Sequence, residues 1–126
     1  MGHDDLRLKN QLCFRLYTAS RLIIKSYTPL LSRLGLTYPQ YVVMMALWER
    51  DHRPVNDIAR QLMLQTNTVT PLLKRMEAMG LVARKKSAGD HRQTIVELTA
   101  KGIAMEDEAG DIPATQVQRF ICNGAT

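Results

Sequence analysis

Residues 66–99 read TNTVTPLLKRMEAMGLVARKKSAGDHRQTIVELT. The first part predicts an amphipathic helix with Thr66 as its N-cap and Gly80 as a left-handed stop. Apolar side chains recur at three- and four-residue spacings, which places them on one helix face: Val69, Leu72, Leu73, Met76 and Met79. The other face carries cations and short hydrogen-bonding groups, namely Asn67, Thr68, Thr70, Lys74 and Arg75. Such side chains suit base edges and phosphates, although many solvated helix faces have the same composition.

A basic hairpin is predicted directly after this helix. Residues 81–86 and 93–98 alternate apolar and polar side chains as half-buried strands do, and residues 87–90 have the composition of a turn. Cations gather near the tip of this two-stranded ribbon: Arg84, Lys85, Lys86, His91 and Arg92. We expect the ribbon to contact phosphates or the narrow minor groove of an A/T tract.

The composition of the 126 residues, 45% of them hydrophobic, predicts one globular domain with a net charge of +5. Residues 65–99 hold six Lys or Arg against three Asp or Glu, a balance of +3, whereas residues 100–126 carry −2. This uneven charge favours a polyanion over a membrane as the partner. The apolar run 41–48 is too short to span a bilayer and the first residues lack a signal-peptide pattern, so we expect a cytoplasmic protein.

The remaining segments complete a mainly α fold with a small two-stranded β-wing, an α+β winged helix-turn-helix. We predict a long helix over residues 6–34 that ends at Gly35, a capping box at residues 37–40, and a central buried helix over 41–48. A short helix over 55–63 braces the helix that begins at Thr66, which we call the reader helix, and residues 100–108 form another helix. The predicted domain covers residues 1–113, with helices in 6–50 and the helix-turn-helix plus wing in 54–99. A short tail, frayed over its last dozen residues, covers 114–126.

Reaction chemistry is not visible in the sequence. It lacks the glycine, HExxH, GxSxG and CxxC patterns of common enzymes, and His3, His52 and His91 are separate, so we predict no enzyme, metal site or cofactor. Cys13 lies on an apolar helix, where a cysteine is usually a small buried hydrophobe. Tyr17, Tyr27 and Tyr38 offer an alternative, because tyrosine hydroxyls that donate to a thiolate lower the pKa of the thiol.

Four motifs resemble the MarR family, and more narrowly its organic-hydroperoxide-responsive repressors (OhrR). They are LKNQLCFRLY at 8–17, LTYPQY at 36–41, VTPLLKRME at 69–77 and the wing signature DHR at 90–92. The resemblance runs over most of the chain, from about residue 6 to about residue 113. The first two motifs carry the similarity to the peroxide-sensing branch.

The resemblance implies a homodimeric repressor of a pseudo-palindromic operator that an organic hydroperoxide inactivates. Cys13 matches the sensing cysteine, which is oxidised to a sulfenic acid. Tyr17 matches a tyrosine that contacts it within the chain, and Tyr27 and Tyr38 match two that reach it from the other subunit. Arg92 matches the minor-groove arginine and Asp90 the acid that orients it. The full set of expected DNA-binding residues is Thr66, Asn67, Thr68, Thr70, Lys74, Arg75, Arg84, Lys85, Lys86, Asp90 and Arg92.

The C-terminal part departs from this pattern. Family members continue through a long dimerisation helix, whereas no strong amphipathic pattern follows Pro113, so we expect a truncated helix and a weakened or altered dimer. Cys122 is either a resolving cysteine that forms a disulfide with the partner's Cys13 or an incidental thiol.

Three other interpretations stay open. In the first, a phenolic ligand controls the repressor and Cys13 is structural. In the second, the protein is a thiol peroxidase, against which the basic wing argues. In the third, it is a truncated dimerisation partner that inhibits a full-length relative.

Overall fold

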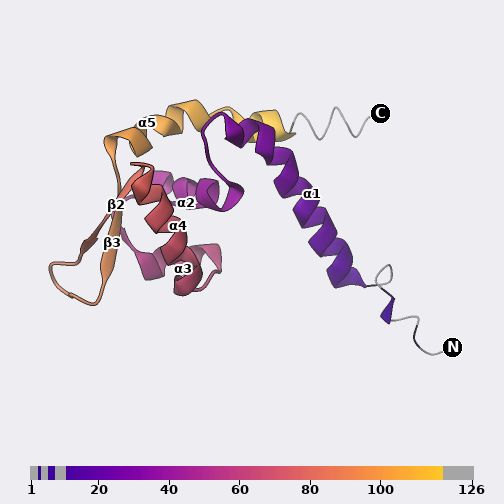
Figure 1. Ribbon diagram of the computed structural model, residues 1–126, viewed down its shortest axis with the longest axis horizontal. Helices are drawn as coiled ribbons and strands as arrows, with labels where there is room; N and C mark the ends of the chain where they lie inside the picture. Colours follow the sequence, from indigo (N-terminus) through magenta and orange to yellow (C-terminus); the bar gives the residue numbers. More distant parts are fainter. Residues whose placement is uncertain (1–2, 4–5, 8–10, 118–126) are drawn as a thin grey trace.

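The computed structural model describes residues 3, 6–7 and 11–117 (Figure 1). The predicted class is confirmed: the chain is mainly helical, with a small antiparallel sheet beside a helix-turn-helix. The elements in chain order are α1 Leu12–Ser32, α2 Tyr38–Glu49, β1 Arg53–Pro54, α3 Val55–Leu62, α4 Thr66–Ala78, β2 Val82–Lys86, β3 Thr94–Leu98 and α5 Ala100–Ala109.

The sheet has three strands in the order β1-β3-β2, where the sequence predicted a two-stranded ribbon. Strands β2 and β3 form the predicted hairpin, within one residue of the expected bounds. The additional strand β1 pairs Arg53 with Val96 and Pro54 with Ile95. It is only two residues long and ends in proline, which is tolerated at a sheet edge, so it leaves no alternating pattern in the sequence.

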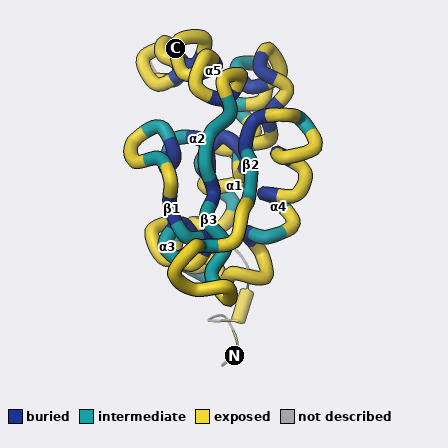
Figure 2. Tube along the Cα trace, turned by 90° about the vertical axis from the view of Figure 1, so that its left-hand side faces the viewer, coloured by how far each residue is buried: buried dark blue, intermediate teal, exposed yellow. Residues whose placement is uncertain are grey.

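Helix α2 forms the centre of the core, as predicted. Val43, Met44 and Leu47 are fully buried, and they belong to the same apolar cluster as Leu73 of α4 and Val96 of β3. Figure 2 shows the buried stretches on α2 and on the inner parts of the strands, whereas the loop between β2 and β3 is exposed. The reader helix and the strands of the wing therefore share one apolar core with α2.

Two sequence signals set the chain's path into α2. Gly35 has φ +73, the left-handed conformation expected at the end of the first helix, and the backbone N–H of Leu36 donates to the carbonyl of Leu31 (3.2 Å). Thr37 and Gln40 then form the predicted capping box, each side chain accepting from the other's backbone N–H.

The first helix is shorter than predicted. The sequence indicated a helix over 6–34, but α1 begins at Leu12, and Gln11 has an extended backbone without a side-chain cap. Leu6 is 75% exposed, so no packing within the chain supports a helix there. Only the C-terminal part of α1 packs on the core, and the rest projects away from the body (Figure 1). In the described ranges, no helix is both long and apolar enough to cross a membrane.

The end of the described chain is more ordered than predicted. Residues 112–117 are helical, so the frayed tail predicted from residue 115 is wrong for residues 115–117. Ile112 and Gln116 lie one turn apart and are both buried, and the Gln116 amide donates to the Ser26 hydroxyl of α1. An ion pair between Arg33 and Asp111 (3.1 Å) adds a second link between α1 and this end of the chain. Cys122 lies outside the described residues.

Candidate nucleic-acid interface and thiol site

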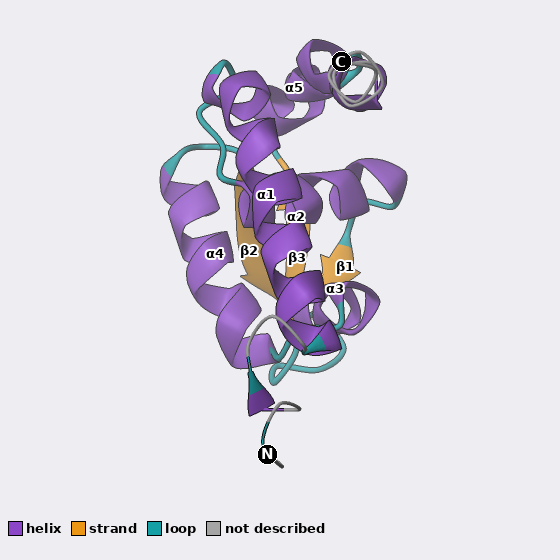
Figure 3. Ribbon diagram, turned by 90° about the vertical axis from the view of Figure 1, so that its right-hand side faces the viewer, coloured by secondary structure: helices purple, strands orange, loops and turns teal. Residues whose placement is uncertain are grey.

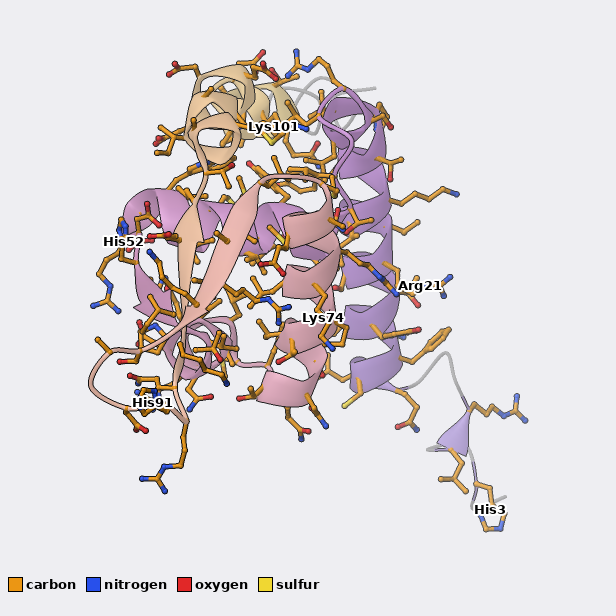
Figure 4. The ribbon with its side chains drawn as sticks, turned by 60° about the vertical axis from the view of Figure 1, so that its left-hand side comes forward. His3, Arg21, His52, Lys74, His91 and Lys101 are labelled. Atoms are coloured by element: carbon orange, nitrogen blue, oxygen red, sulfur yellow. The ribbon has the colours of Figure 1, made fainter. Side chains whose placement is uncertain are left out.

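Helix α4 presents its predicted polar face to solvent. Val69, Leu73 and Met76 are fully buried against the core. The opposite side exposes Thr66, Asn67, Thr68, Lys74 and Arg75, while Thr70 is partly buried. Figure 4 labels Lys74 on this helix and His91 in the loop between β2 and β3. The hydrophobic period thus assigned the two faces of the helix correctly.

The beginning of α4 differs from the prediction. Gln65, not Thr66, is the N-cap, and Thr66 is the first helical residue. The Thr66 hydroxyl lies 3.2 Å from Oδ1 of Asn56 at the start of α3, within hydrogen-bond distance, and the Thr70 hydroxyl donates to the Thr66 carbonyl (2.9 Å). Because Thr66 holds Asn56, it joins the starts of the two helices of the helix-turn-helix and caps neither.

A notch of about 130 Å³ lies where α3, α4 and the wing meet. The structure brings together four of the predicted residues there, Thr66, Thr70, Arg84 and Arg92, although they come from separate segments. Sequence reasoning missed the other polar lining residues, Asn56, Gln93 and Thr94. One signal in the sequence could have indicated Asn56. It is a polar residue at the start of the short helix that precedes α4.

The wing carries its cations outward. Asp90 accepts from the backbone N–H of Arg92 (3.0 Å), and its carboxylate lies 3.6 Å from the Arg92 Nε. The Arg92 side chain is nevertheless 95% exposed. Lys85 and Lys86 are also exposed, and the Lys85 ammonium pairs with Glu97 (2.8 Å). The tip of the wing and the start of α4 lie at the same end of the molecule (Figures 1 and 3).

Arg84 differs from these exposed cations. Its guanidinium donates twice to Glu77 of α4 (3.1 and 3.2 Å), and its backbone N–H donates to the other Glu77 oxygen (3.2 Å). The side-chain bonds from Arg84, followed by its backbone N–H bond, lower the pKa of Glu77. Arg84 is thus paired within the chain, at the middle of β2.

Cys13 is exposed on α1, so the interpretation of this residue as a buried core hydrophobe is wrong within one chain. Tyr17, one turn later, is 60% exposed, and the Arg21 guanidinium lies 5.4 Å from the centre of its ring. Exposure of this kind leaves the thiol accessible to a small oxidant.

Tyr27, in the C-terminal half of α1, and Tyr38, the first residue of α2, form a cluster with Tyr41. The ring centres of Tyr27 and Tyr38 are 5.1 Å apart, and Tyr41 lies 5.9 Å from Tyr27 and 6.3 Å from Tyr38. Burial, and then the neighbouring Tyr38, raise the pKa of Tyr27; burial, Tyr27 and Tyr38 raise the pKa of Tyr41. Both phenols therefore stay protonated and able to donate at neutral pH. Tyr41, only 2% exposed, was predicted as core and not as a member of this cluster.

One chain does not bring the thiol and the tyrosine cluster together. Tyr27 follows Cys13 by 14 positions in one continuous helix. At about 1.5 Å per residue, this spacing separates them by about 21 Å. Any contact between Cys13 and these tyrosines requires a second copy of the chain.

Comparison with known proteins places this winged helix-turn-helix in a family. The model of the transcriptional regulators SarA/Rot matches residues 25–108. The organic hydroperoxide resistance transcriptional regulator of Bacillus subtilis (strain 168) is 46% identical over 112 residues, which cover 89% of this chain and 76% of that regulator. The chain belongs to the SarA/Rot family of transcriptional regulators, which have a MarR-like winged-helix fold.

Solved structures of AbfR, a protein of Staphylococcus epidermidis, have the same fold. Reduced AbfR bound to DNA matches with a TM-score of 0.80 and 40% identity, over 91% of this chain and 80% of that one. The disulfide-formed AbfR matches with a TM-score of 0.68 and 39% identity, over 90% of this chain and 78% of that one. The chain thus superposes better on reduced AbfR bound to DNA than on the disulfide-formed AbfR.

Proposed function

We propose that this protein is a DNA-binding transcriptional repressor that senses organic hydroperoxides by oxidation of Cys13 and then releases its operator. The observation that carries the proposal is the shared exposed side of α4 and the wing. There Lys74, Arg75 and Arg92 point into solvent beside a polar notch, while the apolar faces of both elements are buried. The name of the B. subtilis relative and the DNA complexes of AbfR support the same assignment.

The arrangement supports a specific mode of DNA binding. Helix α4 is proposed to enter the major groove with Asn67, Thr68, Lys74 and Arg75 toward base edges and phosphates. Helix α3 is proposed to support α4 by contacting the DNA backbone through Asn56, which the Thr66 hydroxyl orients. Arg92, held at its base by Asp90 and otherwise exposed, is the side chain proposed for the minor groove.

Two features of α1 support a homodimer. Its outer half exposes large apolar side chains, among them Leu12, Leu16, Leu22 and Ile23, which is unusual for a surface helix of a monomer. Cys13 is also distant from the tyrosine cluster of its own chain. Two copies packed through α1 would cover the apolar side chains and would place Cys13 near Tyr27 and Tyr38 of a second copy.

The sensing chemistry requires only the thiol and the oxidant. The Cys13 thiolate attacks one peroxide oxygen, so an S–O bond forms, the O–O bond breaks, and the leaving alkoxide takes a proton to become an alcohol. The sulfur is oxidised to a sulfenic acid and the hydroperoxide is reduced. Protonated tyrosines donate hydrogen bonds to the thiolate but not in the same way to the product, so oxidation changes the contacts at the α1 interface. A shift there alters the spacing of the two reader helices and weakens the grip on the operator.

The test compares wild type with Cys13→Ser on the DNA upstream of the protein's own gene. Reduced wild type should bind this DNA specifically and with an affinity that falls as salt rises. Cumene hydroperoxide should weaken the binding of wild type by about tenfold or more, an allosteric coupling of ordinary size. Cys13→Ser should bind equally well and should not respond. Release of the serine variant by hydroperoxide would refute the sensing role, and release by a phenolic compound alone would favour the ligand-controlled alternative.

Three further measurements refine the proposal. If Cys122 resolves the sulfenic acid, oxidised wild type should migrate as a disulfide-linked dimer without reductant, whereas Cys122→Ser should not. A regulator should consume about one hydroperoxide per thiol, while sustained turnover with a thiol reductant would indicate a peroxidase. The mass of the reduced protein in solution tests the homodimer directly.

A further inference from the structure

The middle of strand β2 is fastened to the reader helix by one carboxylate. Glu77 lies in the last turn of α4, and Arg84 is the third residue of β2, beyond the turn at Gly80. Glu77 accepts one bond from the Arg84 backbone and two from its guanidinium, at 3.1 to 3.2 Å. A paired guanidinium fork constrains direction as well as distance, because both of its N–H groups must remain in plane with the carboxylate oxygen.

This contact constrains the whole ribbon. Arg84 pairs with Val96 of β3, so holding Arg84 orients both strands of the hairpin. Helix α4 and β2 lie side by side, as Figure 3 shows, and the contact joins the last turn of α4 to the middle residue of β2. The Arg84 side chain is only 23% exposed and that of Glu77 is 39% exposed, which shields the pair in part from water and salt.

The position of the wing tip is sensitive to the angle that strand β2 makes with α4 at Arg84. Ala88 in the loop lies four residues beyond Arg84, about 13 Å along an extended strand. A rotation of about 10° at Arg84 would therefore move the tip by about 2 Å, several times the tolerance of about 0.5 Å for a productive polar contact. Arg92 has no such freedom if it is to reach its groove while α4 remains seated in the neighbouring one.

We propose that Glu77 is a positioning residue that sets the angle between the reader helix and the wing, so that α4 and Arg92 engage one duplex together. Arg84 serves in this contact and does not itself contact DNA, unlike Lys86 and Arg92. The inference rests on the proposed DNA binding, and it adds a residue and a role that the basic composition of the wing does not indicate.

The binding test is a double-mutant cycle on the regulator's upstream DNA. Arg92→Ala should weaken binding by about tenfold in the wild-type background, as loss of one good groove contact does. In the Glu77→Ala background the same change should cost less than about threefold, because the wing is already out of register. The matched control is Glu106→Ala, which removes an exposed glutamate of α5 and should leave the full effect of Arg92→Ala. Equal effects of Arg92→Ala in the Glu77→Ala and wild-type backgrounds would overturn the proposal.

A charge exchange distinguishes positioning from simple loss of stability. The double variant Glu77→Arg/Arg84→Glu rebuilds the side-chain pair in reverse, so it should recover binding to within about threefold of wild type, whereas either single change should not. Failure of the exchange to recover any binding, with thermal unfolding equal to that of Glu77→Ala, would count against the role.

A distance measurement tests the same role without DNA. Spin labels at Lys74→Cys and Ala88→Cys, in protein carrying Cys13→Ser and Cys122→Ser and diluted with unlabelled chains, report the separation of α4 and the wing tip. Glu77→Ala should broaden this distance distribution, and Glu106→Ala should not. An unchanged distribution in Glu77→Ala would refute the positioning role. Absence of DNA binding by the wild type would instead refute the proposed function, and the distance result would still decide this one.

Discussion

The reader region, α4 with the wing of β2 and β3, differs from the outer half of α1, residues 12–25, in how its apolar side chains are buried. Helix α4 buries Leu73 and Met76 completely, and the wing beside it is fastened by bonds to neighbouring elements. In the described range 12–25 of α1, no side chain is buried, and several of the exposed ones are large and apolar. The same apolar residue types thus stabilise the fold in one region and remain uncovered in the other.

This difference separates two tasks. One chain alone completes the surface proposed for DNA, since the core orients α4 and Glu77 and Asp90 orient two wing arginines. The proposed thiol site is incomplete in one chain, because Cys13 lies about 21 Å along the helix from Tyr27. A detector that is complete only between two chains can change how the chains are spaced, and spacing is what a repressor of a two-part operator must control.

The largest expected loss of stability comes from a substitution in the buried face of α4. Leu73→Ala should lower the free energy of unfolding by about 2–5 kcal/mol, because it opens a cavity in a fully packed core. Leu22 of α1 is 62% exposed, so Leu22→Ala should instead change stability only through self-association. Denaturant unfolding at several protein concentrations separates the two, since the loss from Leu73→Ala does not depend on concentration and the loss from Leu22→Ala does. Equal, concentration-independent losses would show that the outer half of α1 packs within its own chain.

A smaller effect tests how closely α5 fits the reader region. A Cβ at Gly102 would lie 2.3 Å from the Leu81 carbonyl oxygen, and backbone cannot move aside as a side chain can. Gly102→Ala should therefore destabilise the protein by about 1–3 kcal/mol, even though alanine favours a helix over glycine by about 1 kcal/mol. Gly89→Ala in the wing loop, where nothing lies within 4 Å, should change stability by less than about 0.5 kcal/mol. Thermal unfolding measures both, and a neutral Gly102→Ala would refute the close contact.

The smallest effect probes the boundary between the two regions, where Tyr27, Tyr38 and Tyr41 meet. Burial followed by the neighbouring tyrosines raises the pKa of Tyr41 above 10.0, so the unfolded chain loses this proton at lower pH than the folded one. The stabilising contribution is complete below pH 10 and is lost as pH rises through the raised folded pKa. Tyr41→Phe should make the alkaline fall in unfolding free energy shallower without changing its behaviour near neutrality. An identical alkaline fall in the variant would contradict this account.

Sequence periodicity predicted the elements whose information is local. The apolar spacing of α4, the Thr37 capping box and the alternation of β2 and β3 all depend on residues close together in the chain, and the structure confirms each. Strand β1 was missed because two residues cannot display a period, and the start of α1 was misplaced because an exposed apolar stripe looks the same as a buried one.

The candidate site divides in the same way. The exposed position of Arg92 and the hydrogen bond that its backbone N–H donates to Asp90 follow from a short local motif. Asn56, Tyr41 and Glu77 were missed because each acquires its role from a residue 7 to 14 positions away, brought close by a turn or by packing between helices. Arg84 was grouped with the other wing cations because its charge is visible in the sequence and its carboxylate partner is not.

Local chemistry in the chain thus specified a winged helix with a basic reader, since helix faces, caps and hairpins depend on near neighbours whose physical preferences are strong. Folding in three dimensions decided which wing arginine stays exposed, Arg92, and which one pairs with Glu77 of α4, Arg84, and it brought Tyr38 and Tyr41 beside Tyr27. Those outcomes depend on contacts between different helices and strands, and such contacts exist only once these elements pack around the core.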